Sequence, residues 1–341
     1  MRLERSWLVA LFVVLAIVVS ACAAEEEGGT EGTEGAAATE TTQADLSGTS
    51  VTLFGPESSD EEAGAFQDAL DVFAEESGIN VTYTGARDFS DQINAQAAGG
   101  NPPDIAIFPQ PGKVADFARQ GFILALPDSV VAAIDENWTE DWKNFGVVDG
   151  TLYAVPNKSD LKSIVWYNVA GFNEGGYEIP ETWDELTALS DQMIADGNTP
   201  WCVGIESGPA TGWPFTDWVE EMMMREYGAD VYDQWVHHDI PFDDSQVVDV
   251  FNIVRDEWTK EGATYAAGGS IAATPFGDNG QPLADGTCLM HRQASFFAAF
   301  MPEGTEFGPD GQVNTFYFPP VDPDNRPTLV AGTQASAFRD A

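Results

Sequence analysis

The chain has 341 residues, of which 56 are Asp or Glu and 14 are Lys or Arg, so its formal net charge at pH 7 is −42. A field of this sign repels nucleic acids and anionic lipids, which excludes them as binding partners, and it disfavours a polyanionic ligand. The acids are spread along the chain, so we interpret them as a solvated surface; the alternative is acidity that serves a cationic ligand or a metal.

The first 22 residues have the pattern of an export signal. Two arginines precede an apolar run of 13 residues from Trp7 to Val19, which is too short to span a bilayer comfortably. The run leads into Val-Ser-Ala-Cys, which resembles a bacterial lipobox. We therefore expect residues 1–22 to be a lipoprotein signal with Cys22 lipidated; the alternative is an ordinary signal-peptidase site with an incidental cysteine.

Residues 23–48 contain only Ala, Gly, Glu, Asp, Gln, Ser and Thr apart from Leu46. Such a segment cannot bury enough apolar surface to offset the entropy lost on ordering, so it predicts a disordered acidic linker.

The chain that follows alternates short apolar runs with amphipathic stretches. Strands are predicted at 50–54, 79–84 and 103–108, and helices at 61–77, through 93–97 and at 113–120. Alternation of this kind with short connections predicts an α/β fold with a parallel, doubly wound sheet.

The second half begins with different signals. Asp149-Gly150 is typical of a hairpin turn. Thr182 followed by Glu185 predicts a helix that starts with a capping box. From there to about residue 300 the chain is rich in predicted helix and in aromatic residues.

Cys202 and Cys288 form an even pair in a chain expected to be exported. In an oxidising compartment such a pair predicts a disulfide. Neither cysteine has the CxxC or Cys/His spacing of a metal or redox site, which is the less favoured alternative.

Four stretches, in this order, carry a resemblance to a known family: residues 103–112, then 149–156 with 166–168, then 179–186, and 286–292. They resemble the family 1 extracellular solute-binding proteins of carbohydrate ABC importers, the maltose-binding and alpha-glucoside-binding group. The resemblance implies a type II periplasmic-binding-protein fold with a hinge, in which two α/β lobes clamp a sugar and the closed form meets the importer's permease subunits.

On the family pattern, residues 49–156 and 317–341 form the first lobe and residues 157–316 the second. The family normally continues through several more helices, so we also expect a C-terminally truncated chain.

Candidate ligand residues come from two arguments. In α/β sheets, ligands bind in the loops that follow the carboxyl ends of the strands. A sugar also needs aromatic rings for its C–H faces and polar groups for its hydroxyls, which favours the stretch from Trp213 to Trp218; the alternative is that these tryptophans fill the core. The loop argument gives Glu57, Asp60, Arg87, Asp88 and Gln110, the sugar argument gives Trp213, Asp217 and Trp218, and the resemblance adds Lys158 and Asp160 at the lobe crossing and Arg292, Gln293 and Gln334 facing the cleft.

Other classes of function are disfavoured. Adjacent carboxylates such as Asp243-Asp244 and Glu220-Glu221 point in different directions, and the chain has no GxSxG, HExxH or phosphate-cradling motif, so we expect no enzyme and no cofactor. His237-His238-Asp239 has one other histidine to join it, His291, so no metal site is expected.

The sequence thus predicts a monomeric sugar-binding protein, lipid-anchored on the extracellular face of a bacterial cell membrane, that delivers an alpha-glucoside or oligosaccharide to an ABC permease. A binding protein for a cationic ligand such as a polyamine or a metal is the alternative.

Overall fold

The computed structural model describes residues 46–339 and 341. The predicted signal peptide, Cys22 and the predicted linker up to residue 45 lie outside the described residues. Residues 46–48 differ from the prediction of disorder, because Leu46 packs against a hydrophobic core and the Gly48 amide donates to the Gly78 carbonyl over 2.8 Å. Among the described helices, none combines the length and apolar character needed to cross a membrane.

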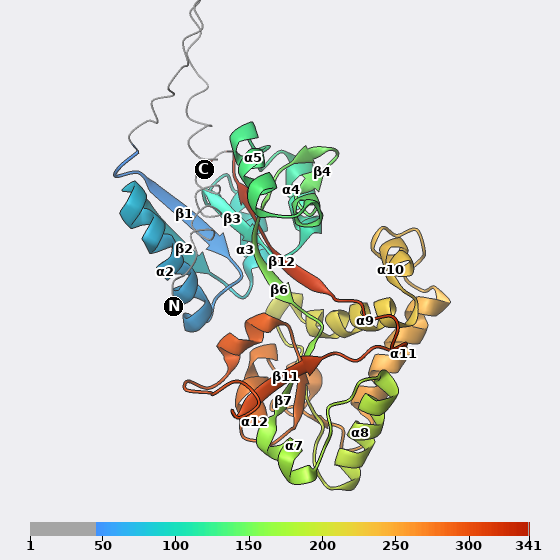
Figure 1. Ribbon diagram of the computed structural model, residues 1–341. Coiled ribbons are helices and arrows are strands. Elements are labelled where there is room, and N and C mark those ends of the chain that lie inside the picture. The colour runs from blue at the N-terminus through green and yellow to red at the C-terminus, as the bar shows by residue number, and fades with distance from the viewer. Residues whose placement is uncertain (1–45, 340) are drawn as a thin grey trace, which may run out of the picture. The chain divides into compact units, whose positions relative to one another are not determined.

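The described chain divides into two compact units. The first unit contains the chain up to Ser159 and the segment Gly332–Ala341, and the second unit is the continuous segment Asp160–Ala331. Two segments of the chain therefore join the units, one on each side of the insertion (Figure 1).

The first unit is built on a five-stranded sheet with strand order β2-β1-β3-β12-β6. The strands β1, β2 and β3 are parallel, as predicted, but β12 is antiparallel to β3, so the sheet is mixed and not purely parallel. The elements of this unit are β1 (Ser50–Gly55), α2 (Asp60–Ser77), β2 (Asn80–Gly85), α3 (Phe89–Ala98), β3 (Ile105–Phe108), α4 (Pro111–Gln120), α5 (Asp128–Asn137), α6 (Glu140–Asn144), β4 (Val147–Val148), β5 (Thr151–Leu152), β6 (Val155–Leu161) and β12 (Val330–Ala337).

Apolar side chains cover both faces of this sheet. In the fully buried strand β3, Ile105 and Ile107 join the core that packs under α2 and α5, while Ala106 and Phe108 join the core under α3 and α4. This burial on both faces explains why the strand is an unbroken apolar run. Because β1, β2 and β3 are parallel, their carboxyl ends, which lead into α2, α3 and α4, lie at one edge of the sheet. This is the edge where we predicted ligand-binding loops.

The second unit has its own five-stranded sheet, with strand order β11-β7-β10-β8-β9. Strand β7 is antiparallel to both β10 and β11, whereas β8 is parallel to β9 and β10. Its elements are β7 (Ile164–Asn168), α7 (Val169–Gly175), α8 (Trp183–Ala195), β8 (Trp201–Cys202), α9 (Trp213–Glu226), α10 (Ala229–Val236), α11 (Ser245–Thr259), β9 (Thr264–Tyr265), α12 (Gly280–Ala284), β10 (Met290–Arg292), β11 (Val313–Tyr317) and the 3₁₀ helices η1 (Gly208–Ala210), η2 (Ile271–Ala273), η3 (Phe276–Asn279) and η4 (Ser295–Phe300).

Two local signals in the sequence are confirmed. Asp149 and Gly150 both have positive φ values, 50° and 82°, and join the antiparallel pair β4 and β5. Thr182 and Glu185 form the predicted capping box at the start of α8. The predicted return of the chain at residue 317 differs from the observed one: β11 pairs with β7 in the second sheet, and the chain enters the first sheet through β12.

Candidate ligand-binding residues

The loops after β1 and β2 of the first unit are in direct contact. A Cβ atom placed on Gly85 would lie 1.7 Å from the carbonyl oxygen of Glu57, so only glycine permits this approach. The contact holds Glu57 beside the end of β2. The sequence placed both loops in the candidate site but gave no sign that they touch.

Glu57 is buried and carries a polar contact at each carboxylate oxygen. The Tyr83 hydroxyl lies 3.0 Å from its Oε2, and the Lys158 ammonium lies 3.1 Å from its Oε1. Burial, followed by the charge of Glu57, raises the pKa of Tyr83, so the phenol stays protonated and acts as a donor. Glu57 therefore connects the loop after β1 to strand β6, which leaves the first unit.

Four other predicted residues of the first unit are exposed and lie at helix starts. Asp60 opens α2 behind Ser59, whose hydroxyl and not the Asp60 carboxylate caps the helix. The Asp88 carboxylate accepts a hydrogen bond from the Gln92 amide over 2.7 Å. Arg87 and Gln110 precede α3 and α4. These positions agree with the fold argument that selected them.

Partly exposed aromatic rings gather around Trp213 in the second unit. Its ring centroid lies 5.0 Å from that of Phe276 and 6.0 Å from that of Phe296, and Phe276 lies 5.1 Å from Phe300. We name Trp213, Phe276, Phe296 and Phe300 the Trp213 cluster. Of these four residues the sequence identified Trp213 alone, because the start of α9, η3 and η4 come together only in the folded chain. The run Ser-Phe-Phe-Ala-Ala-Phe of η4 was the one sequence feature that could have indicated further aromatic residues of the cluster.

Trp218, which the sequence placed in the ligand site, lies in the core. Its ring is 2% exposed and packs edge-on against Trp201, Trp258 and Phe318. Trp218 lies five residues after Trp213 and therefore about 140° around the helix from it, and this rotation directs Trp218 inward. The core alternative weighed for these tryptophans therefore applies to Trp218.

Asp217 and Arg292 belong to a buried ion network. The Lys162 ammonium lies 2.5 Å from Asp217, and the Arg292 guanidinium lies 3.3 Å from Asp217 and 2.9 Å from Glu221. Arg225 pairs with the same Glu221, which also accepts a hydrogen bond from Ser163. We name these six residues, Lys162, Ser163, Asp217, Glu221, Arg225 and Arg292, the Glu221 network.

Glu220 borders this network. Burial raises the pKa of Glu220 to about 7, and the Asp217 charge adds to the effect while Lys162 opposes it. The sequence considered Glu220-Glu221 only as a catalytic pair, whereas in the structure Glu221 is paired with arginines.

The remaining predicted residues have structural partners or different positions from those expected. Gln293 is buried, and its side-chain oxygen accepts a hydrogen bond from the Ala294 amide over 2.9 Å. Gln334 lies within β12, opposite Phe108 of β3. Asp160 stands next to the division between the units. Within the described residues, no group of three or more His, Cys, Asp and Glu side chains could hold a metal ion.

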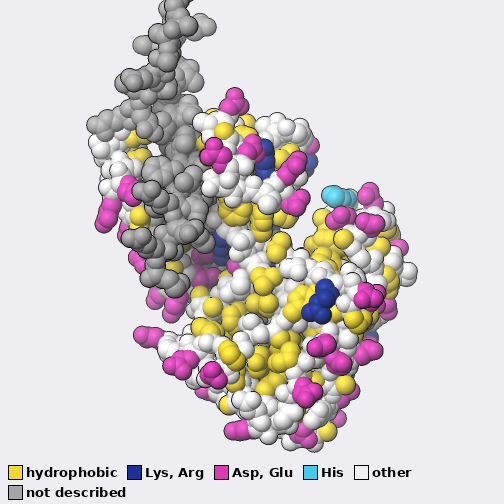
Figure 2. Space-filling model, viewed as in Figure 1, with side chains coloured by type: hydrophobic (Ala, Val, Ile, Leu, Met, Phe, Trp, Pro, Cys, Tyr) yellow, Lys and Arg dark blue, Asp and Glu magenta, His cyan; other side chains and the backbone are white. Residues whose placement is uncertain are grey.

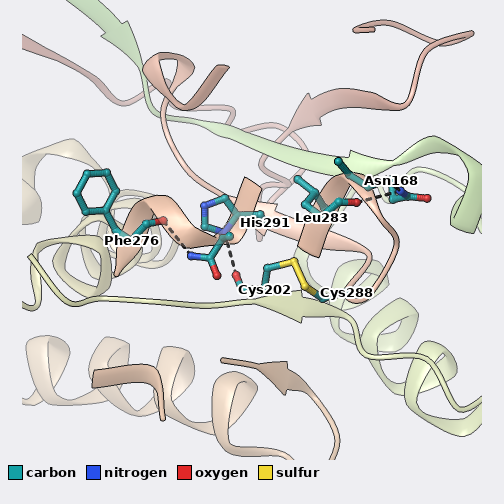
Figure 3. The surroundings of a disulfide bond; sticks show 8 residues. Asn168, Cys202, Phe276, Leu283, Cys288 and His291 are labelled. Atoms are coloured by element: carbon teal, nitrogen blue, oxygen red, sulfur yellow. Dashed lines mark hydrogen bonds between the residues drawn. A yellow bond between two sulfur atoms is a disulfide. The ribbon is translucent and has the colours of Figure 1, made fainter. Parts of the chain in front are cut away.

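The predicted disulfide between Cys202 and Cys288 is present and ties β8 to the segment that leads into β10 (Figure 3). Beside it, the buried ring of His291 lies with its Nδ1 2.8 Å from the Cys202 carbonyl oxygen. Burial lowers the pKa of His291 to about 4, so this ring is neutral at pH 7.

His291 predicts a pH dependence of stability. Its folded pKa is below the unfolded value of about 6.5, so its contribution is complete above pH 6.5 and is lost as the pH falls toward 4. Glu220 has the opposite sign, because a raised carboxyl pKa strengthens folding as the pH falls from about 7. Only a difference between variants therefore isolates the histidine.

We expect His291→Gln to remove roughly 3 kcal/mol of the loss in unfolding free energy between pH 7 and pH 4. Urea titrations at several pH values measure this, and the exposed His238→Gln should follow the parent protein. Parallel pH profiles for the parent and His291→Gln would contradict the assignment.

Carboxylates are scattered over the visible face of both units, and basic side chains show in only a few places (Figure 2). This agrees with the interpretation of the acids as a solvated surface.

Comparisons with known proteins identify the family. Residues 57–281 match the family described as bacterial extracellular solute-binding protein. The chain is 41% identical over 288 residues to the osmoprotective compounds-binding protein GgtB of Synechocystis sp., covering 82% of this chain and 67% of the relative. It is 38% identical over 310 residues to the alpha-glucosides-binding periplasmic protein AglE of Rhizobium meliloti, covering 87% of this chain and 67% of the relative.

Solved structures agree in fold. The solute receptor AcbH superposes with a TM-score of 0.74 at 21% identity, covering 86% of this chain and 72% of that chain. RafE in complex with raffinose superposes with a TM-score of 0.69 at 20% identity, covering 86% and 74%. The resemblance seen in the sequence is confirmed: the chain belongs to the bacterial extracellular solute-binding protein family, a family of binding proteins and not of enzymes.

Proposed function

We propose that this protein captures a neutral sugar, of the alpha-glucoside or oligosaccharide class, outside the cell and delivers it to the permease of an ABC importer. The observation that carries the proposal is the Trp213 cluster, in which four partly exposed aromatic rings meet. Such rings suit the weakly apolar C–H faces of a sugar. The relatives named for alpha-glucosides and for osmoprotective compounds support the same class of ligand.

In this proposal the Trp213 cluster supplies the stacking contact. Polar residues of the first unit remain candidates for hydrogen bonds to sugar hydroxyls: Asp60, Arg87, Asp88 and Gln110, with Glu57 and Lys158 as a preformed ion pair. Binding would shift the protein from an open to a closed form by bending at the joining segments.

We also retain lipidation of Cys22 as part of the proposal. A diacylglycerol on this residue would hold the protein at the outer face of the membrane, close to the permease. The support for it is the sequence pattern that ends at Cys22.

A thermal-shift screen tests the ligand class, because a ligand that binds only the folded protein raises its melting temperature. The full chain with Cys22 replaced by serine is screened against mono-, di- and oligosaccharides, with polyamines and divalent cations as controls. A rise with an alpha-linked glucoside supports the proposal. A rise with polyamines or metal ions alone overturns it and favours the cationic-ligand alternative.

Replacing Trp213 with alanine should weaken binding of the sugar found in the screen by about 5- to 10-fold, because it removes an aromatic contact worth about 1 kcal/mol or slightly more. Isothermal titration calorimetry measures the change. Trp235→Ala is the matched control, since Trp235 is also a partly buried tryptophan of the second unit with two aromatic neighbours but lies in α10, outside the cluster. Equal affinities for the two variants would remove Trp213 from the site.

A further inference from the structure

The two segments that join the units are tied together where they enter the second unit. The Lys162 amide donates to the Leu329 carbonyl over 2.9 Å, and the Leu329 amide donates to the Ser163 hydroxyl over 2.7 Å. The Phe318 amide donates to the Ser163 carbonyl over 2.9 Å. Residues 162–163 and 329 are therefore held against each other by backbone and hydroxyl contacts, although 166 positions separate Ser163 from Leu329.

Glu221 fixes this junction to the body of the second unit. The Ser163 hydroxyl lies 2.9 Å and 3.1 Å from the two Glu221 carboxylate oxygens, and both residues are fully buried. With its one hydrogen donated to the carboxylate, the hydroxyl still accepts from Leu329, so a single side chain connects both joining segments to α9.

Arginine side chains complete the arrangement. Arg225 pairs with Glu221 and donates to the carbonyls of Phe318 and Pro319 over 2.8 Å and 3.0 Å, on the chain that leads toward the second joining segment. Arg292 bridges Glu221 and Asp217 from β10. Lys162, Arg225 and Arg292, three of the 14 basic residues of this acidic chain, therefore lie at one junction.

The first unit holds the same two segments by separate contacts. Lys158 pairs with Glu57, and the Asn157 amide donates to the Thr333 hydroxyl over 3.0 Å. A Cβ on Gly332 would lie 1.9 Å from the Lys158 carbonyl oxygen, so the segments are closely apposed here as well. The Leu161 amide also donates to the Ser295 hydroxyl of the second unit over 3.1 Å. Between the two sets of contacts lie only residues 159–160 and 330–331, where Val330 is 42% exposed.

We propose that Ser163 and Glu221 are positioning residues for ligand capture: they clamp both joining segments to the second unit, so that the bending that accompanies capture is confined to residues 159–160 and 330–331. This inference rests on the proposed function for its purpose. The clamp itself can be tested without a ligand, because loosening it lets more of the backbone move in the unliganded protein.

Ser163→Ala tests the clamp, and Ser190→Ala is its matched control. Ser190 is also a fully buried serine of the second unit whose hydroxyl accepts one hydrogen bond, from the Trp201 indole over 3.2 Å, but it lies in α8. Spin labels on Ala69→Cys in α2 and Ala188→Cys in α8, both exposed helical positions, report the distance between the units in the full chain with Cys22 replaced by serine.

We expect both serine variants to lower the melting temperature by a few degrees, but only Ser163→Ala to broaden the distance distribution without ligand. The same variant should bind sugar roughly tenfold more weakly, because at least one additional residue must be ordered on closure. Lys162→Gln, which removes the pair with Asp217, provides a second variant of the same junction should Ser163→Ala fold poorly.

The two proposals fail separately. Distance distributions of Ser163→Ala or Lys162→Gln that match Ser190→Ala and the parent would overturn the clamp, whether or not a sugar binds. A broadened distance distribution in a protein that no sugar stabilises would support the clamp and contradict the sugar proposal.

Discussion

Replacing Cys202 and Cys288 together by serine should lower the free energy of unfolding by roughly 4–5 kcal/mol. The bond closes a loop of 86 residues, and removing a cross-link of that span restores a large loop entropy to the unfolded chain. Both cysteines are buried, so the serine hydroxyls also enter an apolar core beside Trp166 and Phe297. Urea unfolding followed by tryptophan fluorescence measures the loss.

A reductant provides the control for this prediction. Dithiothreitol should destabilise the parent protein by a similar amount and leave the double variant unaffected, because only the parent has a bond to reduce. A variant as stable as the oxidised parent, or a parent indifferent to reductant, would show that the cross-link contributes little.

Glu221→Gln should cost roughly 3–5 kcal/mol of unfolding free energy. The substitution keeps the shape of the side chain but removes the charge that Arg225 and Arg292 share, and both arginines remain buried. Removing one partner of a buried ion pair leaves a charge whose lost hydration is no longer compensated. Burial already lowers the pKa of Arg225, which shows the direction of that penalty.

Glu75→Gln on the exposed face of α2 is the matched control and should change stability by no more than about 0.5 kcal/mol. Chemical denaturation of both variants at pH 7 and moderate salt gives the comparison. If the two substitutions cost the same, Glu221 does not hold its arginines in the way the contacts indicate.

The fold could be predicted wherever the signal was local. Apolar runs gave β1, β2 and β3 to within two residues, and the hairpin at Asp149-Gly150 and the capping box at Thr182 follow from turn and cap chemistry that needs no tertiary contact. The return of the chain could not be predicted in this way. Both β11 and β12 mix apolar with polar residues and carry no signal of their own that assigns them to a sheet, so only the pairing partners, β7 and β3, show which sheet each one joins.

The candidate residues show the same limit. Trp213 and Trp218 belong to one short motif, yet they differ in position. Trp213 packs with the partly exposed rings of its cluster, whereas Trp218 is buried in the core. Asp217 and Arg292 were chosen for a sugar, and their nearest charged partners are each other, Lys162 and Glu221. Nothing in the sequence marked Ser163, because its role depends on a hydrogen bond to a carboxylate 58 positions away.

The second unit is one uninterrupted stretch of chain, and the hydrogen bond between Lys162 and Leu329 places its two ends side by side. Adjacent ends are the feature that lets a domain be excised or circularly permuted. A short linker across 162 and 329, with new termini opened elsewhere on the surface, would turn the second unit into an independent module. The candidate loops of the first unit and the aromatic rings of the second could then be evolved in separate proteins and recombined.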